Sequence, residues 1–274
     1  MDRDDFLRSL IKIDGYGLEI GPSFGPLVKK SSGAKVEIVD YADAGTLRNH
    51  YRGNKSVNIA NIEEVDYVVE RGSILEAIGK QKHYDYIVAS HVIEHTPDML
   101  GFLKDCERLL KEDGTLLLAV PDKRHCFDVF QPLTSTGSIL QAHLDGRNRP
   151  TPGAIFDDRA YNALRNGEIG WPIAATGELR FYAQLSDAKL SFMNARQTGA
   201  YTDVHNWRFV PSSFRLIIND LHEIGETSLR EDRFYDSVGN EFYMTLRLQG
   251  HGCPVDRLEL AKQMLVEQAQ ISVL

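Results

Sequence analysis

Histidine and carboxylate side chains gather in the middle of this 274-residue chain, where they could carry out proton transfer. His125 and Asp128 follow an apolar run at 115–120, and His143 lies in the turn-rich stretch beyond it. Histidine suits proton transfer because its pKa lies near neutral pH. We hypothesise that His125, Asp128 and His143 share one site in which a histidine is the general base. The alternative for each histidine alone is a hydrogen-bonded structural role.

A second polar group precedes this one. His91, Glu94 and His95 match the H-x-x-E-H pattern of inverted zinc proteases. That pattern needs a helix that presents both histidines to one ion, whereas here it follows a predicted strand and stops at Pro97. We therefore expect no protease site at this position.

Two predicted strands and a glycine turn open the part of the chain that must position these groups. Residues 18–25 read as a strand that runs into a turn with the spacing G-x-x-x-G, and residues 36–40 read as a second strand that ends in Asp40. Gly21 would let the chain turn sharply, and Gly25 would let a following helix sit close to the strand. A carboxylate such as Asp40 can accept hydrogen bonds from both hydroxyls of a ribose. An ordinary strand-to-helix turn is the alternative.

The alternation of strand and helix continues downstream. Residues 84–90 read as a strand, Pro97 is placed to open a helix, and a turn at 113–114 precedes another strand at 115–120. This rhythm predicts a parallel sheet with crossover helices. In such sheets ligands bind at the carboxyl ends of the strands, where the polar residues above are expected.

Taken together, these segments resemble a class I S-adenosylmethionine-dependent methyltransferase. The matching pieces are Glu19, Gly21, Gly25, Asp40, residues 89–95, the turn at 110–114 and residues 120–122. The resemblance covers residues 14–122, and a looser match returns at 205–248. It implies a Rossmann-like α/β fold: a seven-stranded, mostly parallel sheet with an antiparallel terminal strand, and a largely helical or loop insertion after strand five.

The resemblance also implies roles in binding S-adenosylmethionine. The residues concerned are Glu19, Gly21, Gly25, Asp40, Ser73, Ser90 and His91. The first three would surround the amino-acid end of the cofactor, and Asp40 would hold the ribose. Ser73 would lie near the adenine, although many relatives carry an acid close to that turn. Ser90 and His91 would line the methionine portion.

Some relatives that methylate phenolic or ribose hydroxyls coordinate a divalent metal at the end of strand four. They use an acid, a Glu-His pair and one further residue. Here His91 stands in place of the first acid, so the match is incomplete. We expect no metal, with Glu94, His95 and His205 as the alternative site.

The resemblance and the pattern of turn-forming residues divide the chain into four parts. These are 1–122 for the cofactor-binding part, 123–204 for the insertion, 205–250 for the return to the core sheet, and 251–274 for a C-terminal helix that opens at Pro254. Helices are expected at 138–144 and 178–196, and strands at 227–235 and 241–248. An insertion that leaves strand five emerges at the ligand edge and is predicted to wall the acceptor site. The alternatives are an excursion without a role in the site and a dimerisation surface.

Composition limits the partners. A net charge of −8 disfavours a nonspecific nucleic-acid or anionic-membrane surface. Three cysteines without a framework spacing indicate a reducing compartment, and we expect a cytoplasmic protein without a membrane span. We expect no nucleic-acid or membrane partner; a homodimer is one possible assembly.

These features favour an enzyme that methylates a small molecule or glycan. The polar and aromatic mixture of the insertion favours O-methylation of a sugar hydroxyl, which would make this a carbohydrate-modifying enzyme. The alternatives are a phenolic or N-methyltransferase of a small metabolite, a non-catalytic cofactor-binding protein, and a nicotinamide dehydrogenase built on the same sheet.

Overall fold

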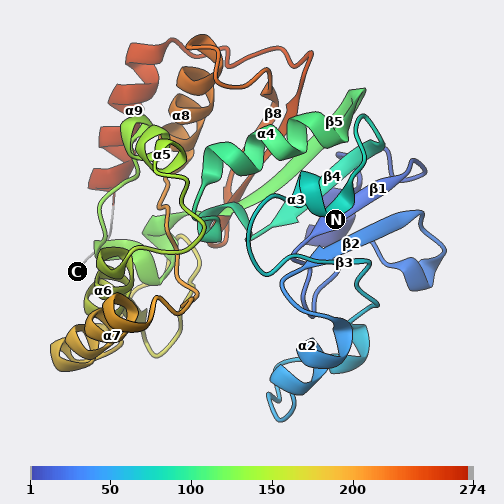
Figure 1. Cartoon of the computed structure of the whole chain (residues 1–274). Coiled ribbons are helices and arrows are strands. Elements are labelled where there is room, and N and C mark those ends of the chain that lie inside the picture. The colour runs from blue at the N-terminus through green and yellow to red at the C-terminus, as the bar shows by residue number, and fades with distance from the viewer. Residues whose placement is uncertain (1, 271–274) are drawn as a thin grey trace.

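A seven-stranded sheet forms the centre of the computed structural model, which describes residues 2–270 (Figure 1). Its strand order is β3-β2-β1-β4-β5-β9-β8. The strands are β1 Gly17–Ile20, β2 Val36–Asp40, β3 Tyr67–Val68, β4 Tyr84–Ser90, β5 Leu110–Pro121, β8 Arg230–Val238 and β9 Glu241–Arg247. Strands β3, β2, β1, β4 and β5 pair in parallel, whereas β9 is antiparallel to both β5 and β8. The expected Rossmann-like α/β sheet is confirmed, and its antiparallel strand lies inside the sheet rather than at the edge.

Both faces of the sheet are apolar, and the side chains of the central strands alternate between them. Ile87 and Ala89 of β4 belong to the larger hydrophobic cluster, while Tyr86 and Val88 belong to the smaller cluster on the other face. This pattern explains why the strand reads as a continuous apolar run. It also fixes which residues remain at the strand tips to face a ligand.

The larger cluster is covered by helices α3 Ile74–Ile78, α4 Met99–Leu109, α5 Thr136–Leu144 and α8 Pro211–Glu223. The smaller cluster is covered by helix α1 Arg3–Arg8 and by the loop that carries Leu27 and Val28. The loop takes this place because no α-helix follows β1; only the short 3-10 turn η1 Lys30–Ser32 does. The prediction that Gly25 lets a helix approach the first strand is therefore wrong.

Helix α4 begins two residues later than the sequence suggested. Asp98 is its N-cap and accepts a hydrogen bond from the Gly101 amide at 2.8 Å, so Pro97 precedes the cap. The helix ends at Leu109 and β5 begins at once, which places the turn expected at 113–114 inside the assigned strand. Helix α2 Ala44–His50 and the 3-10 turn η2 Ile59–Asn61 lie between β2 and β3.

The insertion contains more structure than expected. After 3-10 turns η4 Lys123–His125 and η5 Phe127–Phe130 come α5, α6 Pro152–Tyr161, β6 Ala163–Arg165, β7 Leu179–Phe181 and α7 Leu185–Thr198. Helix α6 was not predicted. The helix expected at 178–196 begins only at Leu185, because residues 179–181 pair with β6 in a small antiparallel sheet. Helices α6 and α7 pack together as a hairpin beside the main body (Figure 1).

The last segments also begin later than predicted. Strand β8 begins at Arg230, because Thr227 instead donates a hydrogen bond to Glu107. The final helix α9 Arg257–Ala269 is capped by Asp256 rather than opened by Pro254. The end of the predicted 251–274 segment, residues 271–274, lies outside the described residues. Among the described residues, no helix combines the length and apolarity that a membrane crossing requires.

Candidate active site

The tips of β1 and β4 meet at the predicted ligand edge. Gly21 has a φ of +63°, and a Cβ built on it would lie 2.9 Å from Cγ2 of Val92, which follows β4. Both the left-handed backbone and this close approach exclude a side chain. The glycine turn is therefore locked against the segment that carries His91 and Glu94.

The carboxylate of Asp40 holds the same turn from the other side. It is buried, and its oxygens accept hydrogen bonds from the amides of Ser23 at 2.9 Å and Tyr41 at 2.8 Å. Burial raises the pKa of Asp40 above its ordinary value. Each oxygen has two lone pairs, so the carboxylate keeps accepting capacity for a ligand hydroxyl.

Glu19 stabilises the loop rather than facing an open site. Its two oxygens accept hydrogen bonds from the amides of Leu27 at 2.6 Å and Val28 at 2.9 Å. Burial, the largest influence, raises the pKa of Glu19 to about 7 despite these bonds. Gly25 lies within the loop that Glu19 holds, and a Cβ built on it would meet no other atom within 4 Å. That open space is where a ligand could approach the backbone.

A hollow of about 670 Å³ lies beyond β3, next to the predicted adenine segment. It is lined by residues 68–73, 76 and 77. Ser73 belongs to this lining, but its hydroxyl already caps α3 and donates to Asp105 at 2.8 Å. The hydroxyl of Ser73 is therefore already engaged, so the residue lines the hollow mainly through its backbone.

His91 ends β4 in a strained conformation and is paired with a carboxylate. Its φ of +53° is uncommon for a residue other than glycine, and its Nε2 lies 2.7 Å from Glu241 Oε2. Burial alone would lower the pKa of His91, but the bond to Glu241 and the charge of Glu94 outweigh it and raise the pKa. Arg3 Nη2 bridges Glu241 Oε2 and Ser90 Oγ, at 2.9 Å from each.

Glu241 is a site residue that sequence reasoning missed. Burial would raise its pKa, but bonds from Arg3 and His91 lower it to about 2. A signal was available: β9 is antiparallel, so its first residue lies at the same edge as the last residues of β4 and β5. Nothing in the sequence indicated that Arg3 would contact Glu241 and Ser90.

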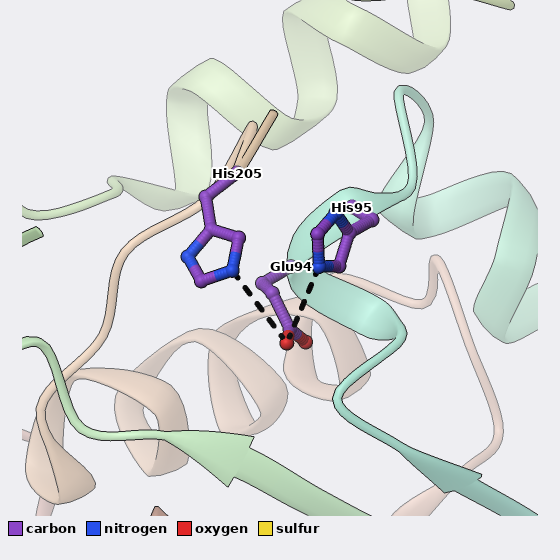
Figure 2. A group of neighbouring side chains, drawn as sticks. All are labelled: Glu94, His95 and His205. Atoms are coloured by element: carbon purple, nitrogen blue, oxygen red, sulfur yellow. Dashed lines mark ion pairs between the residues drawn. The ribbon is translucent and has the colours of Figure 1, made fainter. Parts of the chain in front are cut away.

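A fully buried carboxylate lies beside this pair. Glu94 is 0% exposed, and among the described residues neither of its oxygens has a hydrogen-bond partner. Its Oε1 is 3.6 Å from His91 Nδ1, 3.8 Å from His95 Nε2 and 3.9 Å from His205 Nε2. Figure 2 shows the rings of His95 and His205 turned toward this oxygen. Glu94, His95 and His205 thus lie together, with one ligand atom of each within 4.8 Å of the others.

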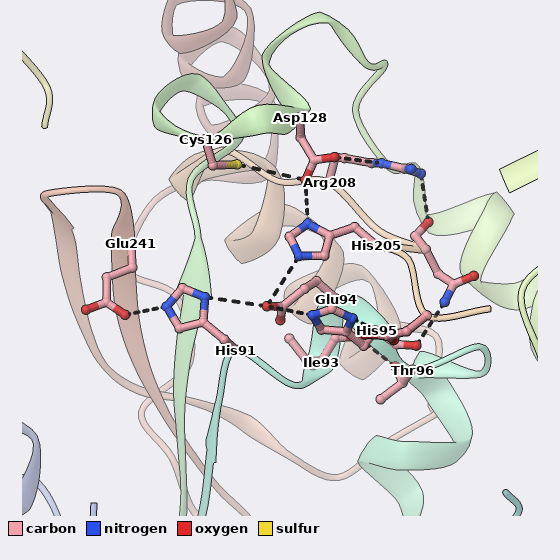
Figure 3. A network of polar contacts seen from close by, with 12 residues as sticks. His91, Ile93, Glu94, His95, Thr96, Cys126, Asp128, His205, Arg208 and Glu241 are labelled. Carbon is pink, nitrogen blue, oxygen red and sulfur yellow. Dashed lines mark hydrogen bonds and ion pairs between the residues drawn. The ribbon is translucent and has the colours of Figure 1, made fainter. Parts of the chain in front are cut away.

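Each of these two rings is hydrogen-bonded to another acid through its far nitrogen, and Figure 3 shows the contact between His205 and Asp128. His95 Nδ1 lies 3.0 Å from Asp203 Oδ1, and His205 Nδ1 lies 2.5 Å from Asp128 Oδ2. Burial would lower the pKa of His95, but Asp203 and Glu94 outweigh it and raise the pKa to about 9. Asp128 is buried, yet the charges of His205 and Arg208 overcome that burial and lower its pKa.

The structure does not bring the three predicted catalytic residues together. Asp128 bonds to His205, whereas His143 on α5 pairs with Asp98 at 2.8 Å. His125 is buried at 8% exposure, and burial lowers its pKa. Its backbone carbonyl accepts the Trp171 amide at 2.8 Å, as a structural residue would. Of the three, only Asp128 belongs to the histidine and carboxylate cluster around Glu94.

Comparison with known proteins places the chain in a family. The sequence profile of a methyltransferase domain family matches residues 4–172. This match covers more than half of the chain, and the chain belongs to that family. Residues 4–172 therefore form a methyltransferase domain, and S-adenosylmethionine is the methyl donor that this assignment implies.

Individual relatives are distant. A highly reducing polyketide synthase of Aspergillus nomiae is 28% identical over 143 residues, which make up 47% of this chain and only 5% of the synthase. A methyltransferase structure from Galdieria sulphuraria is 22% identical and covers 52% of this chain and 51% of its own, with a TM-score of 0.32. The CcbJ methyltransferase of Streptomyces caelestis is 11% identical, with a TM-score of 0.44. The match covers 90% of this chain and 96% of the CcbJ chain.

Proposed function

We propose that this methyltransferase acts on a hydroxyl group of a small molecule or glycan, with His91 as the general base. The observation that carries the proposal is the 2.7 Å pair between His91 Nε2 and Glu241 Oε2 at the tip of β4. In this proposal His91 takes the role of base that the sequence suggested for His125 or His143, and Glu241 orients its ring.

The donor side of the site fits S-adenosylmethionine. The cofactor supplies a methyl group that the positive sulfonium already activates. Asp40 would hold the ribose hydroxyls, the open backbone at Gly25 would accept the amino-acid end, and the hollow beyond β3 would take the adenine. The strained residue His91 lies next to Val92, which packs against the Gly21 turn, and this supports a position of His91 beside the donor.

The acceptor side supports a hydroxyl over an amine. A hydroxyl keeps its proton at neutral pH, so its methylation benefits from a positioned base. If His91 donates its Nε2 hydrogen to Glu241, the ring tautomer is fixed and Nδ1 becomes the basic nitrogen. The side chain of His91 is 37% exposed, so an acceptor can reach it, whereas His125 is buried.

Contacts at the end of the insertion support its predicted role as a wall of the acceptor site. The guanidinium of Arg71, which follows β3, lies over the Tyr201 ring, 6.0 Å from its centroid. Two residues further on, Asp203 binds His95 at 3.0 Å. The segment that ends the insertion therefore crosses from β3 to β4 at the ligand edge. This supports the predicted role of residues 123–204.

The proposal is tested by product profiling with a methyl-labelled donor and a panel of sugars, phenols and amines. We expect label on a hydroxyl, with sugars preferred over phenols. Label found only on amines would contradict the hydroxyl assignment. Donor binding without turnover on any acceptor, including an extract of the source organism, would favour the non-catalytic alternative.

A further inference from the structure

The strongest unexplained feature of the molecule is the side chain of Glu94. This carboxylate is 0% exposed, and within residues 2–270 neither of its oxygens has a hydrogen-bond partner. Such a group is costly to bury unless something else compensates it. The nearest nitrogen atoms lie 3.6 to 3.9 Å from Oε1. These separations are too long for hydrogen bonds.

The same separations suit ligands of one ion. With metal–ligand distances of about 2.1 Å, neighbouring ligand atoms lie roughly 3.0 to 3.4 Å apart. Oε1 of Glu94 would need to approach each histidine Nε2 by roughly half an ångström, and the ligand atoms of the two rings, which lie within 4.8 Å of each other, would need to close by up to roughly 1.5 Å. The rings of His95 and His205 are perpendicular, with centroids 4.6 Å apart, so they approach from two directions rather than stacking.

The acids behind the rings form the second shell that such a site requires. A histidine that binds a metal through one nitrogen usually donates the hydrogen of its other nitrogen to a carboxylate or carbonyl. Asp203 binds the far nitrogen of His95. Asp128 binds the far nitrogen of His205, as Figure 3 shows. Both rings are thereby fixed with the inner Nε2 free to coordinate.

The backbone holds the two halves of this cluster in register. The amides of Asn206 and Trp207 donate to the Glu94 carbonyl at 2.7 and 3.2 Å, and the Trp207 indole donates to the Thr96 carbonyl at 2.6 Å. Asn206 Nδ2 adds a bond to the His95 carbonyl at 2.9 Å. These bonds fix the backbone next to His205 against residues 94–96, so the position of His205 beside Glu94 does not depend on its side-chain rotamer alone.

We propose that Glu94, His95 and His205 bind one divalent first-row transition-metal ion, such as zinc or manganese. Two imidazoles and one carboxylate suit these ions and leave coordination positions open. His91 Nδ1 faces the same Glu94 oxygen, so an acceptor oxygen bound at an open position would lie beside it. This last use of the ion rests on the proposed function, whereas binding of the ion does not.

The test is binding of Co²⁺ and Zn²⁺ alone to the full chain after removal of metals with a chelator. Co²⁺ is followed by its visible absorption and by calorimetry, with no methyl donor or acceptor present. We expect one ion per chain and a loss of affinity of about 100-fold or more in Glu94→Gln, which keeps the size of the side chain. His95→Gln, at a partly exposed position, is the second variant in case the buried substitution disturbs folding.

The control is His143→Asn. His143 resembles His95 in being a partly exposed histidine held by a carboxylate, here at 2.8 Å, but it lies on α5 outside the cluster. We expect its metal affinity to equal that of the unchanged chain. Failure of the unchanged chain to bind one ion, or equal binding by Glu94→Gln and His95→Gln in folded form, would overturn the proposal. Neither outcome depends on methyl transfer.

Discussion

His205 Nε2 lies 3.9 Å from Oε1 of the buried Glu94, although helix α4, strand β5 and the whole insertion separate the two residues along the chain. The contact closes the ligand edge of the sheet, because it ties the end of the insertion to the tip of β4. The arrangement of the candidate active site therefore depends on the insertion being folded, and it gives the following predictions.

Substitution of Gly21 by alanine should both destabilise the protein and weaken donor binding. The φ of +63° is unfavourable for alanine, and the added Cβ would lie 2.9 Å from Val92. We expect a loss of roughly 1–3 kcal/mol in the free energy of unfolding, measured by urea denaturation. Gly25→Ala is the matched control for stability, because its Cβ would meet no other atom within 4 Å. Equal destabilisation by the two substitutions would contradict the packing account.

Glu19 should make stability fall as the pH rises toward neutrality. Its pKa is raised from 4.5 to about 7 in the folded protein, so the folded state holds a proton that the unfolded state releases between these values. Relative to Glu19→Gln, the unchanged protein should have its largest free energy of unfolding below about pH 4.5. It should then decrease by roughly 3 kcal/mol by about pH 7 and level off above it. Urea titrations from pH 4.5 to 8 measure this difference, and two parallel curves would refute the assignment.

His91→Asn should lower kcat by about 10²- to 10⁴-fold, because it removes the proposed base. Glu241→Gln should lower kcat less, since the ring remains but loses the carboxylate that orients it. Both variants should bind the donor with nearly unchanged affinity, which separates a loss of chemistry from a loss of binding. His143→Asn should keep full activity. Turnover is measured as transfer of a labelled methyl group, and undiminished turnover by His91→Asn would rule out its role as base.

The sheet could be predicted because its strands are short apolar runs that end in polar or turn-forming residues. Strands β2 and β4 match the predicted ranges 36–40 and 84–90. The placement of Asp40 and His91 at the ligand edge followed from strand direction alone. The insertion was harder to predict, because β6 and β7 are three residues each and are defined only by pairing with one another.

The side chains of the candidate site could be predicted only in part. The sequence indicated that several histidines and Asp128 reach one edge of the sheet, but not which of these side chains face each other. The histidines are His91, His95, His125, His143 and His205. Asp128 turned out to hold His205, because the bonds from Asn206 and Trp207 fix that segment against residues 94–96. A contact of this kind depends on packing between distant segments, which no local pattern encodes.

The central claim is that S-adenosylmethionine binds at the tips of β1 and β2, with its ribose held by Asp40. Calorimetric titration with S-adenosylmethionine tests it most directly, using the unchanged chain, Asp40→Asn and the His143→Asn control. We predict one bound molecule per chain, an affinity about 10- to 100-fold lower in Asp40→Asn because a charged acceptor is lost, and no change in the control. Binding of NAD in place of S-adenosylmethionine, or equal affinity in folded Asp40→Asn, would contradict the account.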